Sequence, residues 1–209
     1  MLIVLRISLS LGRDMAEVVQ CKLGPRVANP IHVVENWADT DVVKVSGCRS
    51  ELFCDLNLTG KVVLQYAGNV GRVQGLFDVI ECLWKSRNDL LHLCIWGTGA
   101  ALPELRDYVT SRHIQNVSFH GTYSRSQQSE VLSSCDLAVI SLSENMYGMG
   151  VPSKSYNIMA AGKPILFIGD PHSEIGLTVA EQRIGYVIPN DRDASVSYTH
   201  LTLPTNSRV

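Results

Sequence analysis

From residue 61 onward, short apolar runs alternate with amphipathic segments, and this alternation limits the possible folds more than any other feature of the chain. Six runs have the character of buried parallel strands: KVVLQYAG, LLHLCIWG, NVSFHG, DLAVISL, KPILFIG and IGYVIP. The segments between them, of about 10 to 14 residues, carry apolar residues at helical spacing. Strands that alternate with helices predict right-handed βαβ units around a parallel sheet, which is an α/β fold.

Two of the predicted helices carry clear boundary signals. Ser124 followed three residues later by Gln127 is a capping-box pattern that opens a helix. In VPSKSYNIMAAG, we expect Pro152 in the first turn of a helix and Gly162 at its C-cap.

Composition and charge exclude several classes of function. The formal net charge is −2, so there is no basic excess with which to bind nucleic acid. The six cysteines show no C-x-x-C spacing and the six histidines no H-x-x-x-H spacing, so neither a metal site nor a redox motif is predicted. Buried, reduced thiols of a cytosolic protein are expected instead. No segment reaches the roughly 18 apolar residues that a membrane span needs.

In a parallel sheet, ligands bind beyond the carboxyl ends of the strands, so the strand-to-helix loops are the places to look for function. YAGNVGR places Gly68 and Gly71 between a buried strand and a helix, where the backbone can approach a ligand closely. The helix N-terminus beyond them favours an anion such as a diphosphate. A plain tight turn is an equally good interpretation of this loop taken alone.

The next loop, WGTGAAL, does not complete a dinucleotide fingerprint. It supplies G-x-G, but Leu102 stands where the third glycine belongs. About 20 residues further on, the position of the ribose-binding acid holds His120. NAD binding is therefore disfavoured.

The stretch ENMYGMGVPSKSYNIMAAGKP is the most informative loop. It places Ser153 and Lys154 at the start of a helix, where a hydroxyl and an ammonium can both donate to a phosphate. Asn157 follows one turn later. The competing interpretation is an ordinary solvated helix surface.

Taken in order, the blocks IHVVENWADTDVV, GKVVLQYAGNVGRVQGL, IWGTGAALPELRDYV, NVSFHGTYSRSQQSEVLSSCDLAVISL and GVPSKSYNIMAAGKPIL resemble the family 4 retaining glycosyltransferases. The branch they resemble most builds bacterial polysaccharide and O-antigen, and the resemblance covers about residues 15–193. That family has the GT-B architecture, in which two Rossmann-like domains face each other across a cleft. The resemblance therefore implies a Rossmann-like parallel sheet with helices on both faces.

The resemblance also divides the chain into three parts. Residues 1–58 match a remnant of the N-terminal domain and the interdomain linker, and residues 59–194 match the C-terminal, nucleotide-sugar-binding domain. Residues 195–209 include SYTHLTLPT, which reads like a translated sequencing adapter, and we expect this tail to be non-native. The catalytic groups are expected in the N-terminal domain, so this chain alone is expected to be inactive.

Site residues follow from the resemblance by position. The residues that match donor diphosphate-binding positions are Gly68, Asn69, Gly71, Ser153 and Lys154. The residues that match nucleoside-binding positions are Gly97, Gly99, Gly121, Tyr123 and Asn157. Met149 and Asn157 stand where the family's E-x7-E motif has its two glutamates, and Asn69 and Gln74 replace its usual Arg and Lys. An amide at position 157 can still bond ribose hydroxyls.

The resemblance implies transfer of a sugar from a nucleotide-diphosphate donor, UDP-linked by expectation, to a saccharide or lipid-linked acceptor. No cofactor or metal is expected. The expected location is the cytoplasm, at the inner face of the plasma membrane, with peripheral membrane association through the N-terminal domain. Two alternatives remain open: a nucleotide-sugar-binding module without transferase activity, and a relative of the GT-B UDP-N-acetylhexosamine epimerases.

Overall fold

The computed structural model describes residues 8–24, 30–45 and 58–190. Two small strands and a helix come first: β1 (Ser8–Ser10), α1 (Arg13–Leu23) and β2 (Ile31–Val33). The other strands are β3 (Val62–Ala67), β4 (Leu91–Trp96), β5 (Val117–His120), β6 (Leu137–Ser141), β7 (Ile165–Ile168) and β8 (Gly185–Ile188). The other helices are α2 (Leu76–Lys85), α3 (Leu102–Ser111), α4 (Gln128–Ser133), α5 (Lys154–Ala160) and α6 (Glu174–Gln182), with 3-10 turns at Arg72–Gln74 and Arg125–Gln127.

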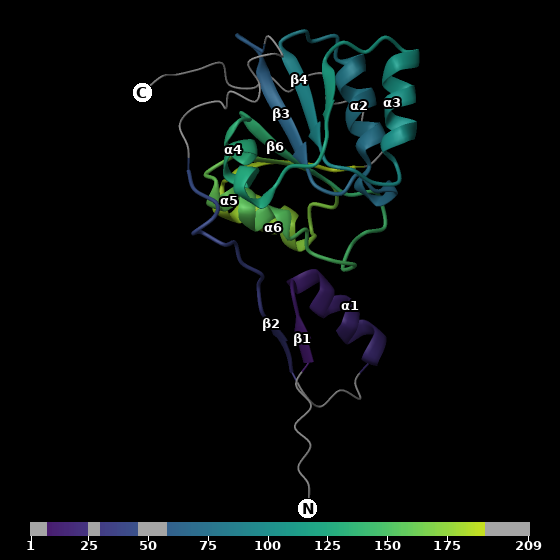
Figure 1. Cartoon of the computed structure of the whole chain (residues 1–209). Coiled ribbons are helices and arrows are strands. Elements are labelled where there is room, and N and C mark those ends of the chain that lie inside the picture. The colour runs from purple at the N-terminus through teal and green to yellow at the C-terminus, as the bar shows by residue number, and fades with distance from the viewer. Residues whose placement is uncertain (1–7, 25–29, 46–57, 191–209) are drawn as a thin grey trace, which may run out of the picture.

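The six strands from β3 onward form one parallel sheet in the order β5-β4-β3-β6-β7-β8. The chain starts in the middle at β3, runs outward through β4 to β5, then returns to the other side of β3 and runs outward again. This is the strand order 3-2-1-4-5-6 of a doubly wound α/β domain. The predicted parallel α/β sheet is confirmed, and Figure 1 shows α2 and α3 on one side of it and α4, α5 and α6 on the other.

Two apolar clusters lie on the two faces of this sheet. Side chains alternate between them along each strand: in β4, Leu93 and Ile95 join the cluster under α2 and α3, whereas Cys94 and Trp96 join the cluster under α4, α5 and α6. This alternation follows from the two-residue period of a strand. Burial on both faces explains why the strands read as nearly continuous apolar runs.

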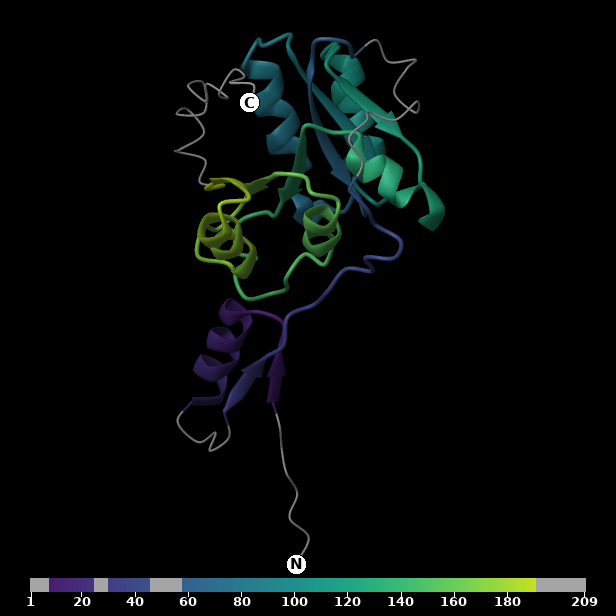
Figure 2. The same cartoon turned by 90° about the vertical axis from the view of Figure 1, so that its left-hand side faces the viewer.

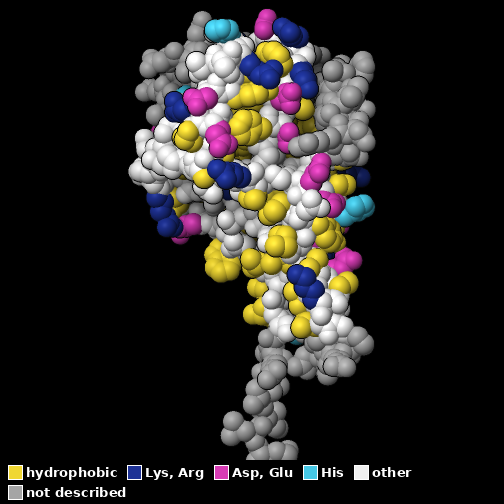
Figure 3. Space-filling view, turned by 90° about the vertical axis from the view of Figure 1, so that its right-hand side faces the viewer, with side chains coloured by type: hydrophobic (Ala, Val, Ile, Leu, Met, Phe, Trp, Pro, Cys, Tyr) yellow, Lys and Arg dark blue, Asp and Glu magenta, His cyan; other side chains and the backbone are white. Residues whose placement is uncertain are grey.

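Figure 3 shows hydrophobic and charged side chains interspersed on the face that carries α2 and α3. Phe77 packs edge-on against Tyr108, with ring centroids 5.6 Å apart. The guanidinium of Arg112 lies 4.7 Å from the Tyr108 ring and 5.0 Å from the Trp84 ring. The arginine therefore covers aromatic surface that would otherwise face water.

β1 and β2 pair in parallel as a separate two-stranded sheet, with α1 beside them. Figures 1 and 2 both show this unit apart from the six-stranded sheet, on the side where α5 and α6 lie. The boundary predicted between 1–58 and 59–194 stays a prediction. The predicted non-native tail, 195–209, lies outside the described residues.

The ends of the helices follow the sequence signals only in part. The capping box of Ser124 and Gln127 is present, but it opens a 3-10 turn that leads into α4. Pro152 was expected inside the first turn of α5, and this was wrong: Ser153 is the N-cap and the helix begins at Lys154. Gly162, with φ of 66°, takes the left-handed conformation just after the C-cap, where glycine avoids steric strain.

Cysteine burial matches the expectation only in part. Cys94 and Cys135 are buried, Cys82 is half-buried and Cys21 is exposed, and all four are free thiols. Cys48 and Cys54 lie outside the described residues. Among the helices described, none is both long and apolar enough to cross a membrane.

Candidate functional site

The order in which the chain adds strands to the sheet reverses between β3 and β6, and this topological switch point defines the candidate site. The connections leaving β3 and β6 run to opposite sides of the sheet, so their loops diverge at its carboxyl edge. Ligands of doubly wound sheets bind in the crevice that such diverging loops leave. The two loops here are residues 68–75 and 142–153, which are the two that the sequence predicts for a diphosphate.

Lys154, the first residue of α5, extends its side chain to the end of β3. Its Nζ is fully buried and has no hydrogen-bond partner among the residues that the structure describes. It lies 3.6 Å from the centre of the Tyr66 ring. Burial lowers the pKa of Lys154 to about 7. A buried ammonium without an acceptor is costly, so such a group points to an anionic ligand.

Gly68 and Lys154 are brought together as the sequence predicts. A Cβ placed on Gly68 would lie 3.8 Å from Cδ of Lys154, so the lysine stem passes over the glycine backbone. The φ of Gly68 is 143°, a conformation that side chains rarely adopt. The solvated-surface interpretation of Lys154 is therefore wrong, because its charged end lies in the interior.

The helical segment predicted beyond Gly68 and Gly71 starts with a 3-10 turn and not with an α-helix. The chain passes through the 3-10 turn Arg72–Gln74, and α2 begins only at Leu76. The Gly68 N–H is already used, because it donates to the Trp96 carbonyl at 2.9 Å. A diphosphate here would depend on the Lys154 ammonium more than on a row of free amides.

Gly97 and Gly99 have a clear packing role. A Cβ on Gly97 would clash with the Gly68 carbonyl, and one on Gly99 with the Val70 carbonyl. Val70 N–H donates to the Thr98 carbonyl at 2.8 Å, so the two loops are bonded side by side. Their glycines permit this close approach, while their predicted contact with the nucleoside stays a prediction.

Gln74, in the loop of residues 68–75 after β3, is another buried polar side chain with an unsatisfied atom. Its Oε1 is buried and has no hydrogen-bond partner within the described part of the chain. A Cβ on Gly71 would lie 2.5 Å from that oxygen, so glycine makes room for the amide. The loop of residues 68–75 thus carries a buried acceptor without a partner in the described structure.

The predicted nucleoside residues lie at two places. Tyr123 meets Trp96 edge-on at 6.1 Å, and Trp96 stacks on His120 at 4.5 Å, at the carboxyl ends of β4 and β5. Next to them, Gly121 has open space where a Cβ would be. Asn157 lines a polar cavity of about 590 Å³. Other residues that line this cavity include Trp37, Asp39, Asp41, Arg125 and Gln128.

A second cavity, of about 410 Å³, lies beyond the carboxyl ends of β6, β7 and β8. It is lined by residues 142–147 together with Asp170, Pro171, Ser173, Pro189 and Asn190. Met149, which takes the place of the first glutamate of the E-x7-E motif, is 63% exposed in the same loop.

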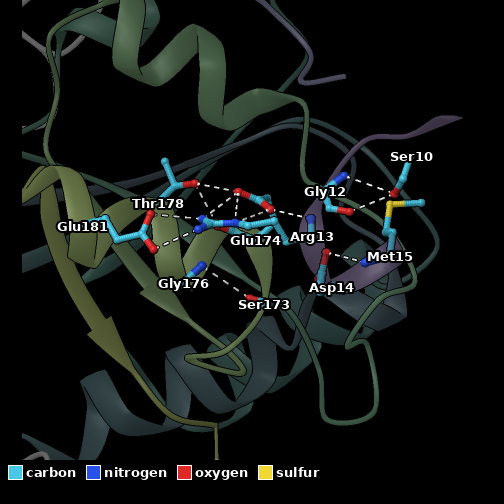
Figure 4. Close-up of polar contacts among 10 residues, drawn as sticks. All are labelled: Ser10, Gly12, Arg13, Asp14, Met15, Ser173, Glu174, Gly176, Thr178 and Glu181. Atoms are coloured by element: carbon cyan, nitrogen blue, oxygen red, sulfur yellow. Dashed lines mark hydrogen bonds and ion pairs between the residues drawn. The ribbon is translucent and has the colours of Figure 1, made fainter. Parts of the chain in front are cut away.

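The β1-α1-β2 unit contacts both α6 and the loop of residues 142–153, and Figure 4 shows the contacts with α6. The Arg13 guanidinium bonds both carboxylates of Glu174 and Glu181, and the Arg13 backbone N–H donates to Glu174 Oε2 at 2.6 Å. Asp14 Oδ2 accepts a hydrogen bond from the Gly148 N–H at 3.3 Å. The unit that precedes the sheet domain therefore contacts the loop that leads to Lys154.

Tyr66 is the site residue that sequence reasoning missed. Within KVVLQYAG it is one more apolar residue of a buried strand, and nothing local distinguishes it from the core. Only the fold places a lysine from α5 over its ring.

The chain is thus a doubly wound α/β domain whose switch point holds a buried lysine amine with no hydrogen-bond partner among the described residues, which makes it a candidate anion site. Comparison with known proteins gives the family. Residues 50–198 match the family described as Glycosyl transferases group 1, and the chain belongs to this family.

Two relatives found by sequence have names consistent with this family. The chain is 30% identical over 181 residues to the probable glycosyltransferase WbjE of Pseudomonas aeruginosa, covering 86% of this chain and 44% of WbjE. It is 30% identical to the putative colanic acid biosynthesis glycosyl transferase WcaI of Escherichia coli, covering 68% of this chain and 33% of WcaI. The chain thus spans less than half the length of these relatives.

Among solved structures, HepE of Anabaena in complex with UDP shares the fold with a TM-score of 0.73 at 15% identity, over 92% of this chain and 52% of HepE. The fold class predicted from the sequence, a Rossmann-like sheet as found in GT-B glycosyltransferases, is confirmed.

Proposed function

We propose that this chain is the donor-binding part of a retaining glycosyltransferase of family 4. The proposed reaction moves a sugar from a nucleotide-diphosphate donor to a saccharide or lipid-linked acceptor in bacterial cell-surface polysaccharide synthesis, at the inner face of the plasma membrane. One observation carries the proposal: the buried Lys154 ammonium at the switch point, next to Gly68, has no partner in the described structure.

UDP is the proposed nucleotide. A solved structure with the same fold, HepE, is described in complex with UDP. WbjE and WcaI, the two relatives above, are described as a glycosyltransferase and as a glycosyl transferase of colanic acid biosynthesis, and this supports a polysaccharide product. The open surface at Gly121 and the half-buried ring of Tyr123 offer room and a ring face for a base.

The chemistry follows from where charge develops. As the bond from the anomeric carbon to the donor diphosphate breaks, negative charge grows on the departing diphosphate. A positive group already in place, and out of water, stabilises that charge without having to reorganise. Lys154 supplies such a charge, and in this proposal it takes the place of a divalent metal. The acceptor hydroxyl forms the new bond and gives its proton to a base that we do not assign to this chain.

Calorimetric titration with UDP tests the proposal on the 209-residue chain. We expect saturable UDP binding that persists in EDTA, together with no response to NAD. Lys154→Met is expected to weaken UDP binding by tenfold or more, because it removes the charge while keeping an unbranched stem. Lys163→Met, which changes a lysine outside the site, is the matched control. UDP binding that is absent, or equal in the two variants, would contradict the proposal.

A further inference from the structure

We propose that Tyr66 is a positioning residue for donor binding: its ring face holds the Lys154 ammonium at the switch point while its hydroxyl fixes the loop after β3. The inference rests on the proposed function, because it assigns Lys154 to the donor diphosphate. It adds a residue that contacts no ligand in this scheme and acts through its two neighbours.

Tyr66 is held rigidly. It is the penultimate residue of β3, is only 1% exposed and packs in the apolar cluster under α2 and α3. A ring fixed in this way can set the position of a flexible lysine, whose four-carbon stem otherwise has many conformations.

The contact with Lys154 leaves the ammonium free to bind. Nζ lies 3.6 Å from the ring centroid, close enough for attraction between the cation and the π face. A carboxylate in the place of the ring would also attract the lysine, but it would occupy the N–H donors and repel a diphosphate. A ring face holds the charge and leaves the three N–H donors for an incoming oxygen.

Within the described part of the chain, no charged side chain pairs with the Lys154 ammonium. Among the described residues, no carboxylate forms an ion pair with Lys154, and burial is the only cause of the lowered pKa of its ammonium. Tyr66 is the titratable residue that faces Nζ. Burial raises the pKa of Tyr66, so the phenol keeps its proton and stays neutral.

The hydroxyl of Tyr66 anchors the loop that follows β3. It donates to the Asn69 carbonyl at 2.6 Å. The loop is tied on its other side by the bond from the Gly68 N–H to the Trp96 carbonyl. One side chain thus fixes both the lysine and the glycine loop over which that lysine passes.

The test compares aromatic rings of nearly equal shape. Phenylalanine at position 66 keeps the ring face and removes the hydroxyl, and pentafluorophenylalanine keeps the shape but withdraws electron density from the face. UDP affinity is measured by calorimetry from pH 6 to 9 for the wild type, for both position-66 variants and for Tyr66→Leu. Tyr108→Leu is the matched control, since it removes another ring that faces a cation, Arg112, on the outside of α3.

We expect phenylalanine to weaken UDP binding by about threefold, because the loop loses the hydroxyl that fixes it, and to keep the pH midpoint of the wild type, because the ring face is retained. We expect pentafluorophenylalanine and leucine to weaken UDP binding at least fivefold at pH 7 and to move the midpoint to lower pH, because the ring no longer favours the charged amine. The terminal phosphate of UDP itself titrates at about pH 6 in every sample, so the comparison uses only the difference in pH midpoint between variants.

Each outcome decides between the two ideas. If the wild type does not bind UDP, the proposed function fails and this inference falls with it. If the wild type binds UDP and pentafluorophenylalanine matches phenylalanine in affinity and midpoint, the positioning role is overturned while the proposed function stands. Because the two rings differ little in volume, this comparison holds even if Tyr66→Leu fails to fold.

Discussion

The guanidinium of Arg13 and the carboxylate of Glu174 are 161 positions apart in the chain and 3.0 Å apart in the fold. Glu174 is buried at the start of α6, and Arg13 begins α1. Burial alone would raise the pKa of Glu174, but the hydrogen bonds from Arg13 outweigh it, so that pKa lies below its ordinary value. This pair joins the β1-α1-β2 unit to the sheet domain.

Arg13→Ala is expected to free α1 from the sheet domain. The change leaves the Glu174 carboxylate buried without its partner, which costs on the order of 1–3 kcal/mol. Amide hydrogen exchange in α1 should become roughly tenfold faster or more, since about 1.4 kcal/mol multiplies an opening equilibrium by ten. Arg125→Ala, which breaks an exposed pair with Asp39, is the control and should change little. Unchanged exchange in α1 would show that the pair does not hold it.

The same pair predicts a pH dependence. Because the pKa of Glu174 is lower in the folded state, its contribution to stability is complete above its ordinary value of 4.5 and is lost as pH falls below it. The protection factors of the α1 amides, in which the intrinsic pH dependence of exchange is divided out, should therefore fall below pH 4.5 in the wild type. Arg13→Ala should show a smaller fall over that range.

Lys154→Met is expected to stabilise the protein while it weakens UDP binding. An unpaired buried ammonium costs stability, and its replacement by an apolar side chain of similar length typically gains on the order of 1–4 kcal/mol. The pKa of Lys154 is about 7 in the fold against an ordinary 10.5, so the unfolded chain binds the extra proton between these values. Wild-type stability should rise with pH across that window, and urea denaturation of Lys154→Met should lack this rise. A less stable Lys154→Met would argue against a costly buried charge.

His92 predicts a loss of stability in acid. Burial, with smaller contributions from Lys61 and His120, lowers the pKa of His92 to about 4. The unfolded chain takes up a proton below about pH 6.5 and the folded chain does not, so stability falls between pH 6.5 and 4. The shift corresponds to about 3 kcal/mol. His92→Gln, which keeps a polar group near Ser118 Oγ, should flatten this part of a urea-denaturation pH profile. An equal slope in the variant would contradict the assignment.

Gly97→Ala and Gly121→Ala should differ sharply in stability. Gly97 has a φ of 127°, and a Cβ there would clash with the Gly68 carbonyl, so we expect a loss of about 3 kcal/mol or more. Gly121 has nothing within 4 Å of the added Cβ, so its change should stay within about 1 kcal/mol. Thermal unfolding of both variants measures the contrast, and equal melting temperatures would refute the packing role of Gly97.

Much of the fold could be predicted because its signals are local. A strand such as LLHLCIWG is apolar throughout because both of its faces are buried, and each helix shows its own 3.6-residue period. Pro152 and the loop after Gly68 were misjudged, because a local pattern does not fix where a helix starts to within a turn.

The candidate site was only half predictable. Gly68 and Lys154 were chosen from their place after strands, and the fold brings them together. Asn157 lines a cavity with residues 37–41 and Gln128 of α4, and its predicted contact with the nucleoside stays a prediction. Lys154 contacts Tyr66 of β3 and Asn157 lines that cavity, although both lie on α5. The sequence of α5 does not show which distant segments will pack against each of them.

The amino-acid sequence by itself determined the alternation of strands and helices, the parallel sheet and the loops at its carboxyl edge, because each depends on residues close together in the chain. Only the tertiary structure decided that the Lys154 ammonium lies buried over the Tyr66 ring, 88 positions earlier, and that Arg13 meets Glu174. Burial and charge pairing depend on which distant segments exclude water from a group, and that is settled only when the sheet has assembled.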